Sequence, residues 1–339
     1  MTTLIDSNQR VLSGMRPTGA LHLGHYHGVL KNWLQLQQQY QCFFFVADWH
    51  ALTTHYNETG IIAENLWEMV IDWLAVGIDP SLSILFIQSQ VPEHAELHLL
   101  LSMITPLSWL ERVPSYKDQQ EKLKGRDLTT YGFLGYPLLQ TADILIYQAG
   151  KVPVGEDQVA HIELTREIAR RFNYLYAREN HKILPEPAAL LTPASKMPGI
   201  DGQKMSKSYA NTIALREHPT SIDKKIRTMP TDPARIRRTD RGDPTKCPVW
   251  NFHEIYSNDE IKSWVQQGCR HATIGCIECK KNIIDAVIAE TTPFRERATN
   301  YQNNLDWVQD LIAEGCATAR QIARDTLEEV RSALGLKLK

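Results

Sequence analysis

The chain has 339 residues, of which 43% are hydrophobic and 22% charged, a balance typical of a globular protein with a sizeable core. Its 18 glycines and 17 prolines are too few for a disordered or fibrous protein, and the length predicts about two domains. Because 37 Lys and Arg face 39 Asp and Glu, the net charge is −2, and any contact with nucleic acid must come from a local basic patch.

The N-terminal residues lack the basic start and apolar core of a secretory signal. The longest apolar stretches, 42–47 and 97–110, are too short or too interrupted to span a membrane. We therefore expect a cytoplasmic protein that makes no membrane contact. Thiols stay reduced in that compartment, so clustered cysteines there indicate metal binding rather than disulfides.

Apolar runs alternate with amphipathic segments at the start of the chain. Strands are predicted at 11–13, 42–48 and 83–89, and helices at 21–39, 64–76 and from about residue 93. This alternation predicts an α/β fold with a parallel, Rossmann-like sheet. Later in the chain, helical spacing at 283–290, 301–314 and 317–334 predicts an all-helical part, with the boundary in the loop 195–212.

Two histidines, His22 and His25, stand where the first predicted strand leads into a helix. A helix N-terminus offers free N–H groups to an anion, and a spacing of three residues would bring the two imidazoles together. They could then hydrogen-bond a phosphate, while Gly24 leaves room for a flat ring or a ribose. Taken alone, such a short pattern more often belongs to two unrelated surface histidines.

A basic loop carries the second motif, Lys204-Met205-Ser206-Lys207-Ser208. Its lysines could clamp a polyphosphate as point charges, and its serines could donate hydrogen bonds. Taken alone, the loop more often is a solvated part of the surface. The sequence contains no Gly-x-x-x-x-Gly-Lys-Ser/Thr loop that would compete as a nucleotide site.

Together the two motifs resemble the His-Ile-Gly-His and Lys-Met-Ser-Lys-Ser signatures of the class I aminoacyl-tRNA synthetases. The resemblance implies that the protein binds ATP with Mg²⁺, that an amino-acid carboxylate attacks the α-phosphate, and that the aminoacyl group then passes to tRNA. It assigns catalytic roles to His22, His25, Lys204 and Lys207. The ATP contacts that it implies in the two motifs are Arg16, Pro17, Thr18, Gly24, His25, Lys204, Met205, Ser206, Lys207 and Ser208.

Asp143 stands in an otherwise apolar helical segment, 136–147. A buried carboxylate needs a partner, which could be a ligand N–H or O–H, or a basic residue or helix cap nearby. This segment and the stretch 152–158, Val-Pro-Val-Gly-Glu-Asp-Gln, resemble the tryptophanyl-tRNA synthetases, and the resemblance extends over nearly the whole chain.

That resemblance implies that Asp143 accepts a hydrogen bond from the indole N–H of L-tryptophan. The other tryptophan-pocket residues that it implies are Tyr136, Gln140, Val152, Val154, Gln158 and His50, and a further ATP-contacting stretch is Gly155, Glu156 and Asp157. It also implies a homodimer that forms through 100–145, a catalytic domain at 1–205, and a tRNA(Trp) anticodon-binding domain at 206–339 whose last helices pack back on the first domain. Tyrosyl-tRNA synthetases, in which an Asp receives a phenol O–H, are the closest alternative.

Four of the six cysteines, Cys247, Cys269, Cys276 and Cys279, fall within 33 residues. Only the last pair has the short spacing of a zinc site, so zinc, free thiols and a four-cysteine iron–sulfur cluster all stay open from the residues alone. The spacing resembles that of a subset of tryptophanyl-tRNA synthetases with a [4Fe–4S] cluster, which the resemblance therefore implies here. Cys42 and Cys316 are expected to be ordinary buried residues.

The region around these cysteines is basic, because 204–246 contains 11 Lys and Arg against 5 Asp and Glu. Aromatic residues lie nearby and could stack on unpaired bases, although most are expected in the core: Trp250, Phe252, Tyr256 and Trp264. We expect this basic surface to face the anticodon loop. Two other classes stay open, a nucleotidyltransferase with a similar histidine motif and a non-catalytic synthetase paralogue that binds RNA.

Overall fold

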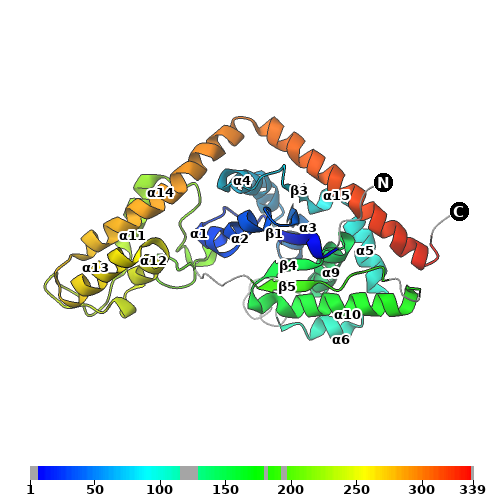
Figure 1. Cartoon of the computed structure of the whole chain (residues 1–339), viewed down its shortest axis with the longest axis horizontal. Helices are drawn as coiled ribbons and strands as arrows, with labels where there is room; N and C mark the ends of the chain where they lie inside the picture. The colour runs from blue at the N-terminus through cyan, green and yellow to red at the C-terminus, as the bar shows by residue number, and fades with distance from the viewer. Residues whose placement is uncertain (1–6, 115–128, 179–181, 192–196, 337–339) are drawn as a thin grey trace.

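The computed structural model describes residues 7–114, 129–178, 182–191 and 197–336. Its sheet consists of five parallel strands in the order β3-β2-β1-β4-β5 (Figure 1). The strands are β1 Arg10–Met15, β2 Gln41–Val46, β3 Ser83–Ile87, β4 Lys151–Val154 and β5 Ala188–Leu191. With β1 in the middle, this order is that of a doubly wound α/β sheet, and it confirms the predicted fold class.

The predicted strands form, with shifted ends. The strand β2 is apolar throughout because its side chains are buried on both faces of the sheet. It ends at Val46, two residues earlier than predicted, and Asp48 begins a helix instead. Strands β4 and β5 are additional to those predicted; both are four residues long, which is too short for a periodic signal.

Helices connect the strands and cover the sheet. Before β4 the helical segments are η1 Ser7–Gln9, α1 Leu23–His25, η2 Tyr26–Leu30, α2 Lys31–Leu36, α3 Asp48–His55, α4 Gly60–Val76, η3 Gln88–Gln90, α5 Glu93–Ser102, α6 Leu107–Glu111, α8 Tyr131–Leu134 and α9 Tyr136–Ile146. Between β4 and the loop that carries Lys204–Ser208, called the lysine loop below, lie η4 Glu156–Gln158 and α10 Val159–Tyr176. Within the described residues, no helix has the length and apolar character needed to cross a membrane.

The first predicted helix, 21–39, is interrupted. A short α-helix, α1, is followed by the π-helix η2 and then by α2. π-helical turns widen a helix locally and often lie at functional sites. Here the widened turn comes directly after His25.

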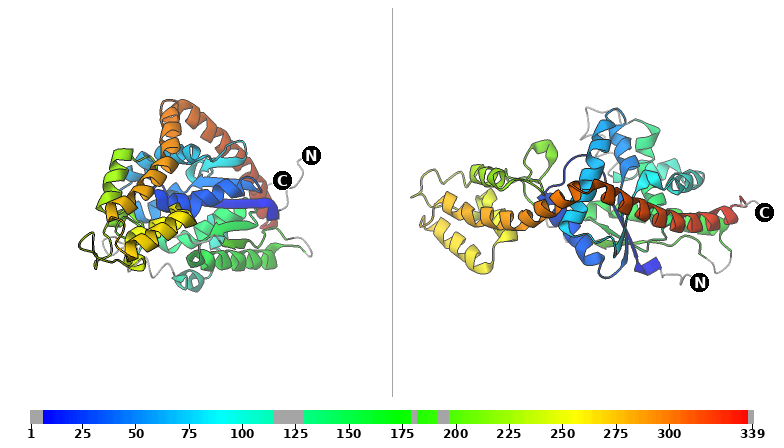
Figure 2. Two further views of the ribbon diagram at one scale, coloured as in Figure 1. Left: turned by 60° about the vertical axis from the view of Figure 1, so that its left-hand side comes forward. Right: turned by 90° about the horizontal axis from the view of Figure 1, so that it is seen from above.

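The later part of the chain is helical, as predicted. It contains η5 Lys207–Tyr209, α11 Pro219–Thr228, η6 Pro244–Lys246, α12 Pro248–Tyr256, α13 Asp259–Arg270, α14 Cys276–Gln302 and α15 Leu305–Ala333. Figure 1 shows α14 rising over α11–α13 and α15 descending along the sheet, and Figure 2 shows from above that these two helices run the length of the molecule.

One long helix, α15, replaces the two predicted at 301–314 and 317–334. Gly315 does not break it, because this glycine packs against the edge strand β3: a β-carbon there would lie 1.9 Å from the Leu85 carbonyl oxygen. The second half of α15 is tied to α5 by ion pairs, from Arg320 and Arg324 to Glu93 and from Arg331 to Glu96. The last helix therefore covers an edge of the sheet that would otherwise be open.

Candidate functional site

The imidazoles of His22 and His25 lie together at the start of α1. His22 is the residue that caps the helix: its Nδ1 accepts the Gly24 N–H at 3.1 Å, and His25 Nδ1 accepts the His22 N–H at 3.2 Å. The ring centroids are 3.9 Å apart. The residues pair as their spacing predicts, although His22 does so from the cap. Because both Nδ1 atoms accept, each neutral ring carries its proton on Nε2, which can donate to an anion.

The lysine loop lies directly over this first motif. Gly19 has a φ of +129°, and a β-carbon on it would lie 2.9 Å from Lys207 Nζ. A β-carbon on Gly24 would likewise lie 3.4 Å from Met205 Cβ. The structure therefore brings together two motifs that are about 180 residues apart in the chain.

A buried asparagine, Asn211, holds the lysine loop in shape. Its Nδ2 donates to the Lys204 carbonyl at 3.1 Å and to Asp201 Oδ1 at 2.8 Å, and its Oδ1 accepts the Ser206 N–H at 2.8 Å. Sequence reasoning missed this residue because no periodicity marks a loop side chain that bonds to backbone.

Burial and the nearby Lys207 lower the pKa of His22 to about 4, and burial together with His22 and Lys207 lowers the pKa of His25 to about 3. Much of Lys207 is exposed, but the surroundings of its ammonium desolvate it and lower its pKa to about 8, against the opposing effect of Asp72. At neutral pH the imidazoles are thus uncharged donors, and Lys207 supplies the positive charge.

Asp72 is a buried carboxyl group on α4 that sequence reasoning missed. Its burial raises its pKa to about 7, although Arg216, whose Nε lies 2.6 Å from Asp72 Oδ1, opposes the rise. A single acidic residue within the otherwise apolar helical stretch 69–76 is the sequence signal that could have identified it.

Asp143 is fully buried on α9 and accepts three hydrogen bonds. His50 Nε2 donates to its Oδ2 at 2.9 Å, while Gln88 Nε2 and His94 Nδ1 donate to its Oδ1 at 2.8 and 2.7 Å. Burial alone would raise the pKa of Asp143, but the bonds from His50 and His94 outweigh it and hold the pKa well below its usual range. The predicted need for a partner is confirmed, and Gln88 and His94 are partners that the sequence did not reveal.

The other predicted tryptophan-pocket residues lie on α9, on β4 and at the end of η4. Tyr136 and Gln140 are on the same helix, and the Tyr136 ring is 5.5 Å from that of His161. Val152 and Val154 are the two buried positions of β4. Gln158 instead donates to its neighbour Asp157 at 3.0 Å.

The predicted ATP-contacting stretch 155–157 is exposed or half-buried between β4 and α10. Burial and the nearby His50 lower the pKa of His161 to about 4, against the opposing effect of the negative charge of Asp157. Arg16, which precedes the first motif, lies within electrostatic reach of the Tyr136 hydroxyl. These contacts connect the predicted ATP and tryptophan residues around one region at the carboxyl ends of the strands.

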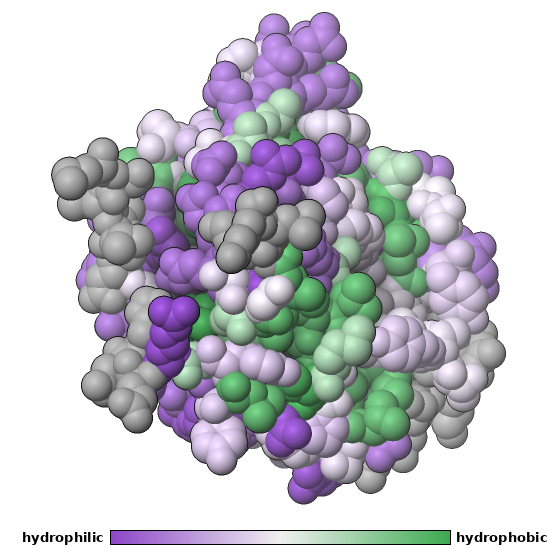
Figure 3. Space-filling view, turned by 90° about the vertical axis from the view of Figure 1, so that its right-hand side faces the viewer, coloured by the Kyte–Doolittle hydropathy of each residue, from purple (hydrophilic) through white to green (hydrophobic). Residues whose placement is uncertain are grey.

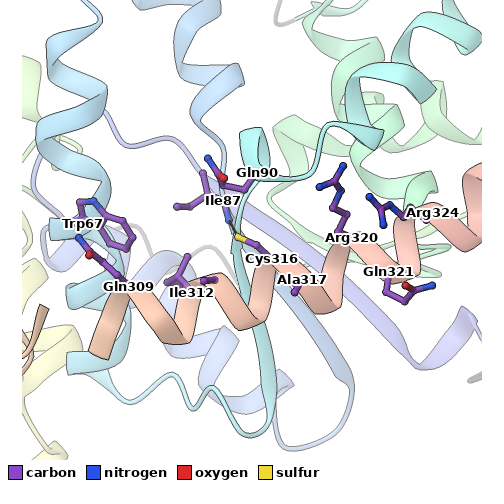
Figure 4. A pocket seen from close by; sticks show the side chains of 11 residues that line it. Trp67, Ile87, Gln90, Gln309, Ile312, Cys316, Ala317, Arg320, Gln321 and Arg324 are labelled. Atoms are coloured by element: carbon purple, nitrogen blue, oxygen red, sulfur yellow. Dashed lines mark hydrogen bonds between the residues drawn. The ribbon is translucent and has the colours of Figure 1, made fainter. Parts of the chain in front are cut away.

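A cavity of about 750 Å³ lies apart from these residues, between α15, α4 and the end of β3. Figure 4 shows Trp67 beside Gln309 of α15, and Ile87 beside Cys316 further along that helix. None of the predicted site residues lines it. The Cys316 thiol accepts the Ile87 N–H at 3.4 Å, which fits its expected role as a buried structural residue.

The predicted metal ligands lie in one region but do not form a preformed metal site. Within the described residues, no three His, Cys, Asp or Glu side chains group closely enough to hold a metal ion. One of the thiols instead contacts a histidine, since His253 Nε2 is 3.2 Å from Cys279 Sγ. Burial, together with the nearby Cys247, Cys276 and Cys269, raises the pKa of the Cys279 thiol to about 12.

A cavity of about 570 Å³ adjoins Cys276 and carries several arginines. Its lining includes Arg227, Arg235, Arg237, Arg238, Cys276 and Lys281. Arg235 is nine-tenths buried, and its Nε has no hydrogen-bond partner among the described residues. Of the nearby aromatics, Phe252 is buried and Trp264 is 38% exposed, so only part of this set belongs to the core.

Comparison with known proteins agrees with this geometry. A family model described as tRNA synthetases class I (W and Y) matches residues 6–291. The chain is 56% identical to the tryptophan--tRNA ligase of Ralstonia nicotianae, over 97% of this chain and 98% of that protein. It is 52% identical to the tryptophan--tRNA ligase of Thermotoga maritima, over 96% of this chain and 99% of that protein.

The fold agrees as well. The crystal structure of tryptophanyl-tRNA synthetase from Campylobacter jejuni complexed with ADP and tryptophan matches with a TM-score of 0.86 and 31% identity, over 96% of this chain and 100% of that one. The chain therefore belongs to the class I tRNA synthetases of the tryptophan and tyrosine type and, within them, to the tryptophan--tRNA ligases. The resemblance stated from the sequence is confirmed at this level.

Proposed function

We propose that the protein uses ATP to convert L-tryptophan into tryptophanyl-adenylate and then transfers the tryptophanyl group to tRNA(Trp). The observation that carries this proposal is the buried, ionised Asp143, which lies beside His50 at the carboxyl ends of β2 and β3. Parallel sheets bind ligands at this edge. A carboxylate there can accept the indole N–H, and a pocket built on that bond strongly rejects an analogue without it.

The activation step needs positioning and charge rather than a protein nucleophile. His22 and His25 can each donate an Nε2–H to phosphate oxygens, and Lys204 and Lys207 can stabilise the negative charge that develops on the leaving pyrophosphate. Mg²⁺ bound with ATP would neutralise further phosphate charge. The predicted contacts from Arg16 to Thr18 and from Gly155 to Asp157 would hold the nucleotide.

Exchange of labelled pyrophosphate into ATP, run with each amino acid in turn, tests the activity. We expect exchange with tryptophan and at least about a hundredfold less with tyrosine or phenylalanine. Exchange with tyrosine instead would favour a tyrosyl enzyme, and no exchange with any amino acid would favour a non-catalytic RNA-binding paralogue. An Asp143→Asn variant then tests the role of Asp143 in tryptophan binding, with Asp79→Asn on the surface as its control.

We further propose that Cys247, Cys269, Cys276 and Cys279 can bind a [4Fe–4S] cluster. Two features support the fit. A β-carbon on Gly242 would lie 2.7 Å from Cys269 Sγ, so glycine keeps space beside that sulfur, and the buried Arg235 beside it could balance thiolate charge. When bound, such a cluster would supply a cross-link between loop and helix or a one-electron centre.

Metal analysis of anaerobically purified protein tests this second proposal. We expect iron and acid-labile sulfide in the protein and in a Cys42→Ser control, and loss of both in Cys276→Ser. Zinc in place of iron, or no metal in any sample, would overturn the assignment.

The chain beyond residue 206 is proposed to bind tRNA(Trp) through the arginine-lined cavity beside Cys276. Phosphate contacts from Arg237 and Arg238, both exposed, fit this role. We expect Arg238→Ala to weaken tRNA binding and reduce its salt dependence, while tRNA-independent pyrophosphate exchange stays unchanged. Loss of exchange as well would contradict a role limited to tRNA.

The protein is proposed to act in the cytoplasm, where translation consumes its product, and to form a homodimer. Exposed apolar side chains near the expected interface support the dimer: Leu99, Met103, Leu107 and Tyr131. Figure 3 shows apolar surface gathered on the face that carries α5. Sedimentation equilibrium tests it, and Met103→Glu is expected to yield a monomer.

A further inference from the structure

The hydrogen bonds to Asp143 leave few positions on its carboxylate for a ligand. An ionised carboxylate offers about four acceptor positions, two on each oxygen. Gln88 and His94 occupy both positions on Oδ1, and His50 occupies one on Oδ2. One acceptor position therefore remains, and it is on the oxygen that His50 shares.

The three donors differ in burial, which shows where the open position faces. Gln88 and His94 are fully buried. The His50 side chain is 12% exposed and is the one of the three that reaches the surface. The Oδ1 side of the carboxylate is thus closed by protein, and the Oδ2 side faces the site.

Tyr147 determines which ring nitrogen of His94 carries the proton. Its Nδ1 must carry a proton to donate to Asp143, and its Nε2 lies 2.7 Å from the Tyr147 hydroxyl. Burial, with the negative charge of Asp143, raises the pKa of Tyr147 well above its usual range, so the phenol stays protonated. Tyr147 is fully buried, and donation to Nε2 satisfies its proton and fixes His94 in the tautomer that donates to Asp143.

A purely structural role would require only that a buried aspartate be satisfied. The network does more, since it ends on an unfilled acceptor position beside a partly exposed histidine. The buried Gln88 Oε1 also has no hydrogen-bond partner among the described residues, so the amide is held by its bond to Asp143 rather than by a closed core network. This arrangement suits the orientation of one oxygen toward a ligand.

We propose that Gln88, His94 and Tyr147 are positioning residues that hold the Asp143 carboxylate with a single acceptor position open on Oδ2, and that they set how strongly the site prefers an aromatic side chain with a ring N–H over an isostere without one. This inference rests on the proposed function. Tyr147 acts through His94, and His94 and Gln88 act through Asp143, so none of the three needs to touch the substrate.

The test compares tryptophan with β-(3-benzothienyl)alanine, in which sulfur replaces the ring N–H, in the pyrophosphate exchange assay. For Tyr147→Phe we expect the KM for tryptophan to rise roughly tenfold, the KM for ATP to stay unchanged, and the preference for tryptophan over the isostere to fall roughly tenfold. Tyr40→Phe is the matched control, because it also removes one hydroxyl contact, the bond that Tyr40 Oη accepts from Lys151.

Two further variants separate positioning from stability. His94→Asn keeps a donor near the place of Nδ1 and should retain most of the preference, whereas His94→Leu should lose it. In the His94→Asn protein, adding Tyr147→Phe should change nothing further, because the residue through which Tyr147 acts is gone. If Tyr147→Phe does not fold, Gln88→Met provides the same measurement.

The outcomes are distinguishable. A wild-type protein that prefers tryptophan while the variants lose stability but keep the full preference would overturn the positioning role and leave the proposed function intact. A wild-type protein that does not respond to tryptophan would overturn the function itself, and the inference with it.

Discussion

Gly19 lies directly against the ammonium of Lys207, so a β-carbon on the glycine would lie 2.9 Å from Lys207 Nζ. The backbone of Gly19 also has a φ of +129°, a conformation that residues other than glycine rarely adopt. Two separate constraints, conformation and space, therefore make this position a glycine, and the second depends on Lys207 lying over the first motif.

Gly19→Ala is expected to lower activity because the new methyl group strains the turn and displaces Lys207. We predict a loss of about 1–2 kcal/mol in the free energy of unfolding and a clear drop in kcat/KM for ATP in pyrophosphate exchange. Gly28→Ala, where nothing lies within 4 Å of the added carbon, is the control. Equal activity of the two variants would mean that Lys207 does not work from this position.

The pH dependence of ATP use should report Lys207. Its pKa is lowered to about 8, so the lysine loses its charge as the pH rises above 8, and kcat/KM for ATP should fall there. His22 and His25, with pKa values of about 4 and 3, stay neutral throughout this range. Lys207→Arg should move the alkaline limb beyond the measured range, and an unchanged limb would assign it to another group.

The same shift has an opposite effect on stability. The folded protein holds the Lys207 proton less tightly than the unfolded chain, so between about 8 and 10.5 the unfolded state binds more protons. This group's contribution to the free energy of unfolding therefore rises with pH in that window. Activity and stability should change in opposite directions, which denaturant titration at pH 7.5 and 9.5 can measure against Lys207→Arg.

The helix that carries the first motif is joined to the later helices through His27. The Tyr256 hydroxyl donates to Glu290 Oε2 at 2.7 Å, and His27 Nε2 lies 3.0 Å from each of them. Tyr256→Phe is expected to cost about 1–2 kcal/mol of unfolding free energy, because it removes a half-buried donor to a carboxylate. Tyr174→Phe, at an exposed position, is the control, and equal denaturation midpoints would show that this junction adds no stability.

Gly315 should tolerate no larger residue. Gly315→Ala would drive α15 away from the Leu85 carbonyl, and we expect a loss of at least ~2 kcal/mol of unfolding free energy. Gly60→Ala, which adds a methyl group in open space near the start of α4, should be neutral or slightly stabilising. Thermal denaturation of the two variants compares them directly, and similar transition temperatures would refute close packing of α15 on β3.

Local patterns in the sequence determined the alternation of strands and helices, the two phosphate-binding motifs, and an aspartate that needs a partner. These features depend on neighbours within about one turn of helix or one strand, which is the range that periodicity and motif spacing report. The resemblance carried by the same residues indicated the family. The sequence did not reveal the short strands β4 and β5 or the unbroken helix α15. Pairing of β4 with β1 and of β5 with β4 stabilises these strands, and packing against β3 stabilises α15.

Only the tertiary structure decided which side chains meet. Gln88 and His94 donate to Asp143 from 55 and 49 residues away. The role of Asn211 is visible only from the backbone atoms to which it hydrogen-bonds. The pKa values of His22 and Lys207 likewise follow from burial and from charges on other elements. Composition reports how much charge a chain carries, whereas the effect of a charge depends on distance and desolvation, which the fold sets.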